Sequence, residues 1–164
     1  MVTRRTFLLS SLVPGLAQFG GSVSLHASPE RNTLVVVTRR EHALTQLSLR
    51  DLKWLYTGEQ VNGPDGAALV CFNHVAGSPA RVAFDSVVLQ MSPDQVGRYW
   101  VDRKIRGQTG APRSVPSVDT LRRVILAMPR SVTYLYAADV IPELKVLKVD
   151  GKLPADPAYP LHIE

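Results

Sequence analysis

Leu34-Val35-Val36-Val37 is the stretch that decides the fold. Its apolar residues are consecutive and mostly β-branched, which predicts a strand that is buried on both faces. The segment from Ser131 to Tyr136 does not alternate clearly between apolar and polar residues either, and it predicts a second strand of this kind. Because a sheet buried on both faces needs covering elements on each, we expect an α/β domain with a central sheet between two layers of helices.

Signals for the start and end of helices separate the predicted strands. Ser48 and Asp51 have the spacing of a capping box, and Gly58 is placed to end the helix that they begin. Ser78-Pro79 and Ser92-Pro93 each place a serine at the N-cap and a proline at the first helical position. The expected order is a strand at 34–37, a helix from 49, a strand at 68–72, helices from 79 and 93, a loop at 106–116, a helix after Ser117, strands at 131–136 and 144–149, and a surface tail at 153–164.

Charge and cysteine content exclude several classes of function. The chain has 19 Lys and Arg against 14 Asp and Glu, a net charge of +5, and no basic run is long enough for a nucleic-acid surface. Arg122-Arg123 is most simply a solvated helix face. Cys71 is single, so an internal disulfide is ruled out, and the scattered histidines do not form a zinc pattern. We therefore expect no nucleic-acid partner, no metal and no other cofactor.

Residues 1–27 have the pattern of an export signal. Thr3-Arg4-Arg5-Thr6-Phe7-Leu8 resembles a twin-arginine signal, and the apolar stretch that ends at Phe19 is shorter than the roughly 20 residues that a membrane span needs. We expect cleavage after Ala27, export to the periplasm with the twin-arginine translocon as a partner, and one domain at 28–164. Without residues 1–27 the net charge is 17 minus 14, or +3. The alternative is a buried N-terminal helix that carries two arginines.

Several short motifs follow one another through the rest of the chain. They are Leu47-Ser48-Leu49-Arg50-Asp51-Leu52, Leu55-Tyr56-Thr57-Gly58, Pro64-Asp65-Gly66, Gly77-Ser78, Met128-Pro129-Arg130-Ser131-Val132-Thr133-Tyr134, Val149-Asp150-Gly151 and Tyr159-Pro160-Leu161. In this order they resemble the second lobe of the phosphate-binding proteins of ABC importers, over residues 34 to 162. The resemblance implies a three-layer single lobe of a periplasmic binding protein-like fold, similar to the short relatives of that family. Full members close two lobes on the anion, so one lobe would present half a site.

The candidate site is the segment from Asn73 to Arg81, between a strand and a helix start. The N–H groups at a helix N-terminus converge on one point, and the macrodipole adds positive potential. Gly77 permits close approach of the backbone, Ser78 offers a hydroxyl, and Arg81 offers a charge-assisted contact. Together with Asn73 these are the expected ligand-binding residues for a small oxyanion such as phosphate. The alternative is an ordinary Ser-Pro helix cap with a solvated Arg81.

The same loop departs from the "R.DGSGT" phosphate loop of that family. His74 stands where the arginine falls, Ala76 replaces the acid, Pro79 removes an N–H donor, and Ala80 removes a hydroxyl. Three or four lost contacts of ~1–3 kcal/mol each would remove most of a micromolar affinity of roughly 8 kcal/mol. The sequence therefore does not predict tight phosphate capture.

Two classes of function stay open after these departures. The first is a weak oxyanion-binding module connected with ABC phosphate transport, with a membrane transporter as its partner. The second is a protein-interaction or sensory domain that has kept the scaffold and lost the ligand. We expect no enzyme and assign no catalytic residue, because His74 with Ser78 is the only nucleophile–base pair and the sequence shows no third group to orient it.

Export generates the first prediction. Replacing Arg4 and Arg5 with Lys keeps the positive charge but removes the guanidinium pair. The variant should stay in the cytoplasm with residues 1–27 attached, whereas the wild type reaches the periplasm. Fractionation followed by mass spectrometry of the N-terminus checks this, and unchanged delivery of the variant would refute the assignment.

Overall fold

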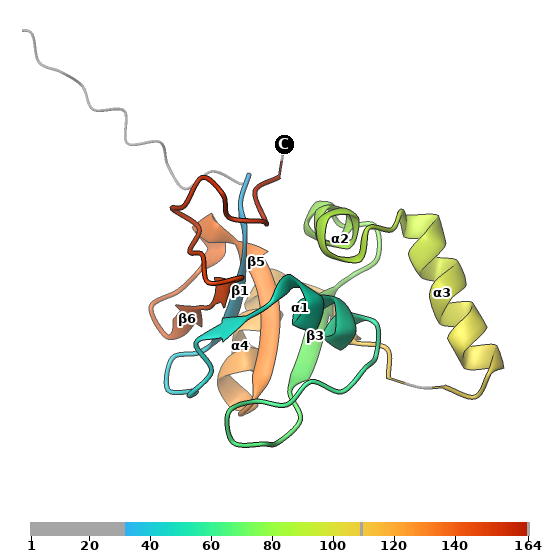
Figure 1. The fold of residues 1–164 in the computed structure, drawn as a ribbon, viewed down its shortest axis with the longest axis horizontal. Coiled ribbons are helices and arrows are strands. Elements are labelled where there is room, and N and C mark those ends of the chain that lie inside the picture. Colours follow the sequence, from blue (N-terminus) through green and yellow to red (C-terminus); the bar gives the residue numbers. More distant parts are fainter. Residues whose placement is uncertain (1–31, 109, 164) are drawn as a thin grey trace, which may run out of the picture.

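A five-stranded mixed sheet forms the centre of the molecule (Figure 1). The computed structural model describes residues 32–108 and 110–163, and the expected export signal lies outside them. The strand order is β4-β3-β5-β1-β6, with β3 parallel to β4 and β5, and β1 antiparallel to β5 and β6. A smaller sheet pairs β2 with β7 in parallel. The strands are β1 (Leu34–Arg39), β2 (Gln46–Leu47), β3 (Val70–His74), β4 (Arg113–Val115), β5 (Ser131–Tyr136), β6 (Leu144–Val146) and β7 (Lys148–Val149).

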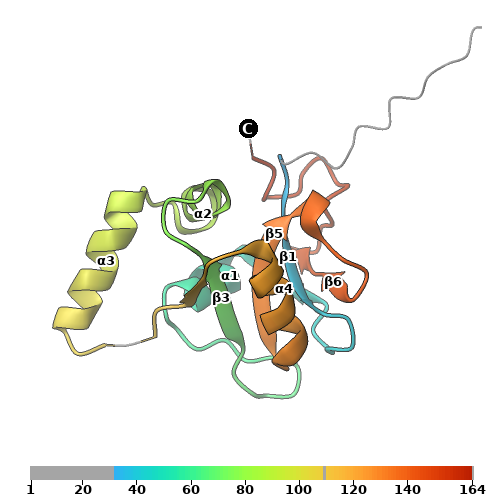
Figure 2. The same ribbon diagram turned by 180° about the vertical axis from the view of Figure 1, so that it is seen from behind.

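Helices cover both faces of the five-stranded sheet (Figures 1 and 2). Leu34 and Val36 belong to one apolar cluster, which includes residues of α1 (Leu49–Tyr56), α2 (Pro79–Phe84) and the π-helix η1 (Asp85–Leu89). Val35 and Val37 belong to a second cluster together with residues of α4 (Val118–Ala127). The prediction of a sheet between two layers of helices is therefore confirmed. The remaining helices are α3 (Pro93–Ile105) and the 3-10 helix η2 (Ala137–Asp139).

The predicted helix caps are present in α1 and α4. Ser48 accepts a hydrogen bond from the amide of Asp51, and the Asp51 carboxylate accepts one from the amide of Ser48. Gly58 follows the C-cap of α1 with φ +87°, a conformation that favours glycine. Ser117 accepts a hydrogen bond from the amide of Thr120 at the start of α4. Local sequence signals thus determine where these helices begin and end.

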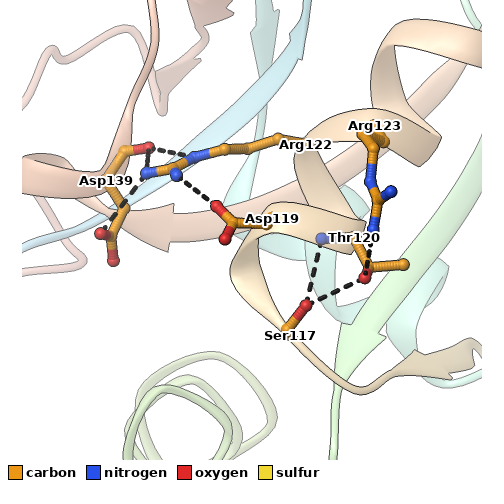
Figure 3. Close-up of polar contacts among 6 residues, drawn as sticks. All are labelled: Ser117, Asp119, Thr120, Arg122, Arg123 and Asp139. Atoms are coloured by element: carbon orange, nitrogen blue, oxygen red, sulfur yellow. Dashed lines mark hydrogen bonds and ion pairs between the residues drawn. The ribbon is translucent and has the colours of Figure 1, made fainter.

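Arg122 connects α4 to η2, in contrast to its expected place on a solvated face (Figure 3). Its Nε and Nη2 donate to the carbonyl oxygen of Asp139 at 2.9 and 2.6 Å, and its Nη1 donates to Asp119 at 2.8 Å. Arg123 is exposed and contacts only Thr120 of its own helix among the described residues, as expected for a solvated face. The helix sequence alone does not distinguish the two arginines, because the Asp139 carbonyl that Arg122 binds belongs to a different element.

The C-terminal segment is part of the core, so the expected surface tail is wrong. Tyr159 and Leu161 are 3% and 0% exposed and belong to the same apolar cluster as Leu34. The amide of Leu34 donates to the carbonyl of Leu161 at 3.0 Å. Prolines suggested an irregular path along the surface, but the apolar side chains between them bury this segment beside β1.

Three element boundaries also differ from expectation. The expected loop at 106–116 contains β4, the expected strand at 144–149 divides between the two sheets, and the helix from Pro79 continues as η1. Pairing with β3 explains β4, because Phe72, Asn73 and His74 stand opposite Arg113, Ser114 and Val115. Strand partners that are distant in sequence therefore determine where β4, β6 and β7 lie.

Burial of β1 generates the second prediction. Val36→Asp places an unpaired carboxylate at a position with 0% exposure, which should lower the free energy of unfolding by several kcal/mol, out of a typical ~5–15 kcal/mol. Leu153→Asp is the matched control, because Leu153 is 46% exposed. Urea unfolding followed by circular dichroism checks both. An unchanged Val36→Asp variant would mean that β1 is not in the core.

Candidate functional site

The four predicted site residues lie in one strand–loop–helix unit. Asn73 is in β3, Gly77 is in the following loop with φ +79°, and Ser78 and Arg81 begin α2. The positive φ of Gly77 favours glycine, and a Cβ there would meet no atom within 4 Å. The loop backbone at Gly77 is therefore open to an approaching group. The side chains of the other three residues differ in what they contact.

Asn73 and His74 attach the end of β3 to β5. The hydroxyl of Tyr134 donates to Oδ1 of Asn73, and Nε2 of His74 lies 2.8 Å from the carbonyl oxygen of Tyr134. Asn73 is 1% exposed, and burial lowers the pKa of His74 below its usual value of 6.5. Both side chains are engaged within the protein, so they hold the loop in place.

An aromatic cluster packs around Tyr134, the residue to which Asn73 and His74 are bonded. The ring of Tyr134 stacks on that of Phe84, with a centroid distance of 3.8 Å and an interplanar angle of 5°. Tyr56 packs against both rings and donates its hydroxyl to the carbonyl of Phe72 at 3.0 Å. Sequence reasoning missed this cluster, because its members lie far apart in the chain and each was read only as part of its own element.

Arg81 forms a buried ion pair with Asp85. Its Nε lies 2.6 Å from Oδ2 of Asp85, and the two side chains are 9% and 4% exposed. Its Nη1 donates to the carbonyl of His74 at 3.4 Å. The solvated Arg81 of the alternative interpretation is therefore wrong. The four-residue spacing from Arg81 to Asp85 was the signal that could have revealed the pair.

Asp85 is only partly compensated by Arg81. Its Oδ1 is buried and has no hydrogen-bond partner among the described residues. Burial raises the pKa of Asp85 above its usual value of 3.8, and the hydrogen bond from Arg81 opposes that shift. The ion pair therefore keeps a desolvated carboxylate next to the guanidinium.

Ser78 begins α2 without capping it. Its backbone has the extended conformation of an N-cap residue, but its side chain makes no capping bond. The hydroxyl is buried and has no hydrogen-bond partner in the described part of the chain, and the Ser78 amide donates to the carbonyl of Val75 at 3.2 Å. The expected cap at Ser78 is thus absent, and its hydroxyl keeps an unused hydrogen-bonding capacity.

A pocket of about 260 Å³ adjoins this unit. The loop at Gly77, the Arg81–Asp85 pair, α3 and the segment before β4 enclose it. Its charged wall is the ion pair, and most of the rest is apolar. The lining residues are Ala76, Gly77, Arg81, Val82, Asp85, Pro93, Val96, Gly97, Trp100, Ala111, Pro112 and Ser114.

Solved structures share this arrangement of strands and helices. An ABC-type phosphate transport receptor from Vibrio cholerae matches with a TM-score of 0.60 and 15% identity, over 75% of this chain and 48% of that chain. PstS from Borrelia burgdorferi matches with a TM-score of 0.58 and 20% identity, over 75% and 49%. A putative phosphate ABC transporter substrate-binding protein from Clostridium perfringens, with bound phosphate, matches with a TM-score of 0.60 and 18% identity, over 74% and 46%.

The chain has a periplasmic binding protein-like fold. It spans about half the length of these relatives, in agreement with the single lobe that the sequence motifs imply. No protein-family model and no curated protein matched the chain. The likeness is one of fold, and the function has to be argued from the site itself.

Two further features of the described residues bear on function. Residues 32–108 and 110–163 include no helix of the length and apolar character that a membrane crossing requires. In the same ranges, no group of three or more His, Cys, Asp or Glu side chains is placed to hold a metal ion. The polar groups that line the pocket include the loop backbone at Gly77 and the Arg81–Asp85 pair, whereas Ser78, the next residue after Gly77, has a buried hydroxyl and is not among the lining residues.

The ion pair generates the third prediction. Arg81→Met leaves the Asp85 carboxylate buried without its partner and should lower the free energy of unfolding at neutral pH by about 3–5 kcal/mol. Losing Arg81 raises the pKa of Asp85 further, so the folded state binds a proton that the unfolded state releases. The destabilisation should therefore be full above the folded pKa and should shrink as the pH falls toward the unfolded value near 3.8.

Urea unfolding of variant and wild type between neutral and acidic pH measures this difference. Arg106→Met is the matched control, because Arg106 also pairs with an acid four residues away, Asp102, but both are exposed. Its loss should be below about 1 kcal/mol at every pH. An Arg81→Met variant with the same small loss would show that the pair is not desolvated.

Proposed function

We propose that this domain is a binding module that takes a small oxyanion weakly at the wall formed by Gly77, Ser78 and Arg81. The observation that carries the proposal is the Arg81 guanidinium in the pocket wall. Its Nε and Nη1 are used within the chain, whereas its Nη2 has no hydrogen bond to any residue that the structure describes. A planar guanidinium with a free edge is suited to an oxyanion.

The neighbouring groups add donors of the right kind. The first-turn amides of Ala80 and Arg81 have no acceptor inside the helix, and the helix dipole favours negative charge there. The Ser78 hydroxyl has no partner within the described residues. Asn73 belongs to the site as the residue that holds the loop to Tyr134. The likeness to receptors titled as phosphate-binding supports phosphate as the first oxyanion to test.

The same geometry supports weak binding. The Asp85 carboxylate beside Arg81 cancels part of its positive charge, Pro79 lacks an N–H, and the Ser78 amide already donates to Val75. Screening by salt, which acts over ~8 Å at physiological ionic strength, weakens the attraction further where the site is exposed to solvent. We therefore propose a dissociation constant in the millimolar range rather than tight capture.

The cellular context follows from the same proposal. Export of the chain through the twin-arginine pathway would place the module in the periplasm, where a membrane transporter or another protein would be its partner. The alternative function is that of a protein-interaction or sensory domain without a ligand. Exposed apolar residues on α3 favour it, with Val101 at 60% and Ile105 at 79% exposure.

An NMR titration generates the fourth prediction. Adding phosphate or sulfate to the chain without its export signal, at constant ionic strength, should shift the amides of residues 76–78, 80 and 81 before any others. Arg81→Lys keeps a charge beside Asp85 but loses the planar fork, so it should reduce the response at least several-fold. Ser78→Ala should reduce it without loss of stability, because Ser78 makes no cap bond.

Arg130→Lys is the matched control for this titration. Arg130 also forms an ion pair, at 2.8 Å to Asp65, but it is exposed and away from the pocket. The Arg130→Lys protein should respond to phosphate as the wild type does. If tens of millimolar phosphate and sulfate leave residues 76–81 unmoved, the oxyanion proposal fails and the interaction domain takes its place.

A further inference from the structure

Helix α3 lies at the outer end of the molecule, with no other described element beyond it (Figures 1 and 2). Its inner face carries Val96, which is the one buried residue of the helix, together with the half-buried Tyr99 and Trp100. Tyr99 donates to the carbonyl of Thr57, and Arg103 pairs with Glu59 at 3.0 Å. These contacts hold the helix to the body by one face only.

The outer face of α3 combines apolar side chains with open space. Val101 and Ile105 are 60% and 79% exposed, the two most exposed of the large apolar residues described. Gly97 is one turn before Val101 on the same side of the helix, and a Cβ there would meet nothing within 4 Å. Gly97, Val101 and Ile105 line one shallow hollow with Asp94, Arg98 and Asp102.

One row of charges along this helix alternates in sign every four residues. It consists of Asp94, Arg98 and Asp102 of α3 and of Arg106 at its C-cap, and all four side chains are exposed. Arg103 and Lys104 lie outside this row. Arg106 pairs with Asp102 in the same helix at 2.8 Å. Asp94 and Arg98 make no ion pair with any residue between 32 and 163 that the structure describes.

This order of charges is complementary to that of a second copy of the helix that runs in the opposite direction. Read backwards, the series becomes Arg, Asp, Arg, Asp, so an antiparallel copy places an opposite charge against every position. A parallel copy in register would instead place like charges together. An antiparallel pair centred at the level of residue 100 places Arg98 opposite the partner's Asp102, and Asp94 opposite the partner's Arg106.

We propose that two copies of this chain associate through the outer faces of α3, packed antiparallel about a twofold axis at the level of residue 100. Such an interface is isologous, because the same patch serves both subunits. The apolar residues Val101 and Ile105 lose exposed surface, and the flanking charges select the antiparallel direction. The proposal does not depend on oxyanion binding at Gly77 and Arg81.

The size of the helix sets the strength of the association. A helix of 13 residues is about 20 Å long, and one face of it is smaller than the ~800 Å² per partner of a standard interface. The dimer should therefore be weak and in rapid exchange. Because its charges are exposed, it should weaken further in high salt.

A charge-exchange experiment tests both the interface and its direction. In sedimentation equilibrium of the chain without its export signal, the mean mass of the wild type should rise with concentration, and less so in high salt. Arg98→Asp opposes two acids across the interface and Asp102→Arg opposes two arginines, so each variant alone should be monomeric. An equimolar mixture of the two restores opposite charges at both contacts and should associate as the wild type does.

Arg123→Asp on α4 is the control, since it makes the same charge change on an exposed arginine outside α3 and should keep wild-type association. Thermal melting verifies that each variant is folded, as expected for exposed positions. A wild type that stays monomeric at millimolar concentration overturns the proposal. The outer face of α3 would then be a contact surface for a different protein. A mixture of folded variants that does not associate overturns the antiparallel pairing.

Discussion

Two-sided burial of β1 and β5 is the constraint on which the rest of this structure depends. The two strands pair antiparallel from Leu34 opposite Tyr136 to Thr38 opposite Val132, and both are buried along nearly their whole length. Alternate side chains point into two separate apolar clusters, so each face requires its own cover. The helices α1 and α2 supply one cover and α4 the other. The C-terminal segment completes the first through Tyr159 and Leu161.

Tyr134 transmits this constraint to the candidate site. It is fully buried in β5, yet its backbone carbonyl contacts His74 and its hydroxyl contacts Asn73, both at the end of β3. Its ring stacks on Phe84 at the end of α2. The side chain and the backbone of Tyr134 therefore hold the end of β3 from which the loop begins, and its ring packs against the last residue of the helix that follows the loop. A rigid loop of this kind is a precondition for binding by backbone groups.

The Arg81–Asp85 pair forms without a ligand. The fold therefore permits weak binding of a ligand at Arg81 but does not depend on that binding. A buried guanidinium needs a counter-charge, and Asp85 supplies it from one turn further along the same helix. That carboxylate supplies the counter-charge of the buried guanidinium and at the same time reduces the positive potential that an oxyanion would meet. The outer face of α3 has no such internal compensation, because Asp94 and Arg98 are without ion pairs among the described residues and Val101 and Ile105 remain exposed. The two proposed binding surfaces of the molecule therefore share helix α3, with the pocket on its inner side, the dimer contact on its outer side, and Pro93 and Gly97 bordering both.

The elements with local signals could be predicted from the sequence. The run from Leu34 to Val37, the capping box at Ser48 and the cap at Ser117 specify a strand and two helix starts through neighbours in the chain, and the structure has each of them. Which polar side chains have a hydrogen-bond partner depends on tertiary contacts. The sequence suggested a surface residue at Arg122 and a helix cap at Ser78, but Arg122 binds the Asp139 carbonyl, and the Ser78 hydroxyl is buried without a cap bond. Likewise β4 exists because β3 offers it a pairing edge, and the C-terminal segment is buried because β1 leaves an apolar face beside it. Periodicity and capping act over a few residues, whereas hydrogen-bond partners and burial depend on segments that meet only when the sheet has formed.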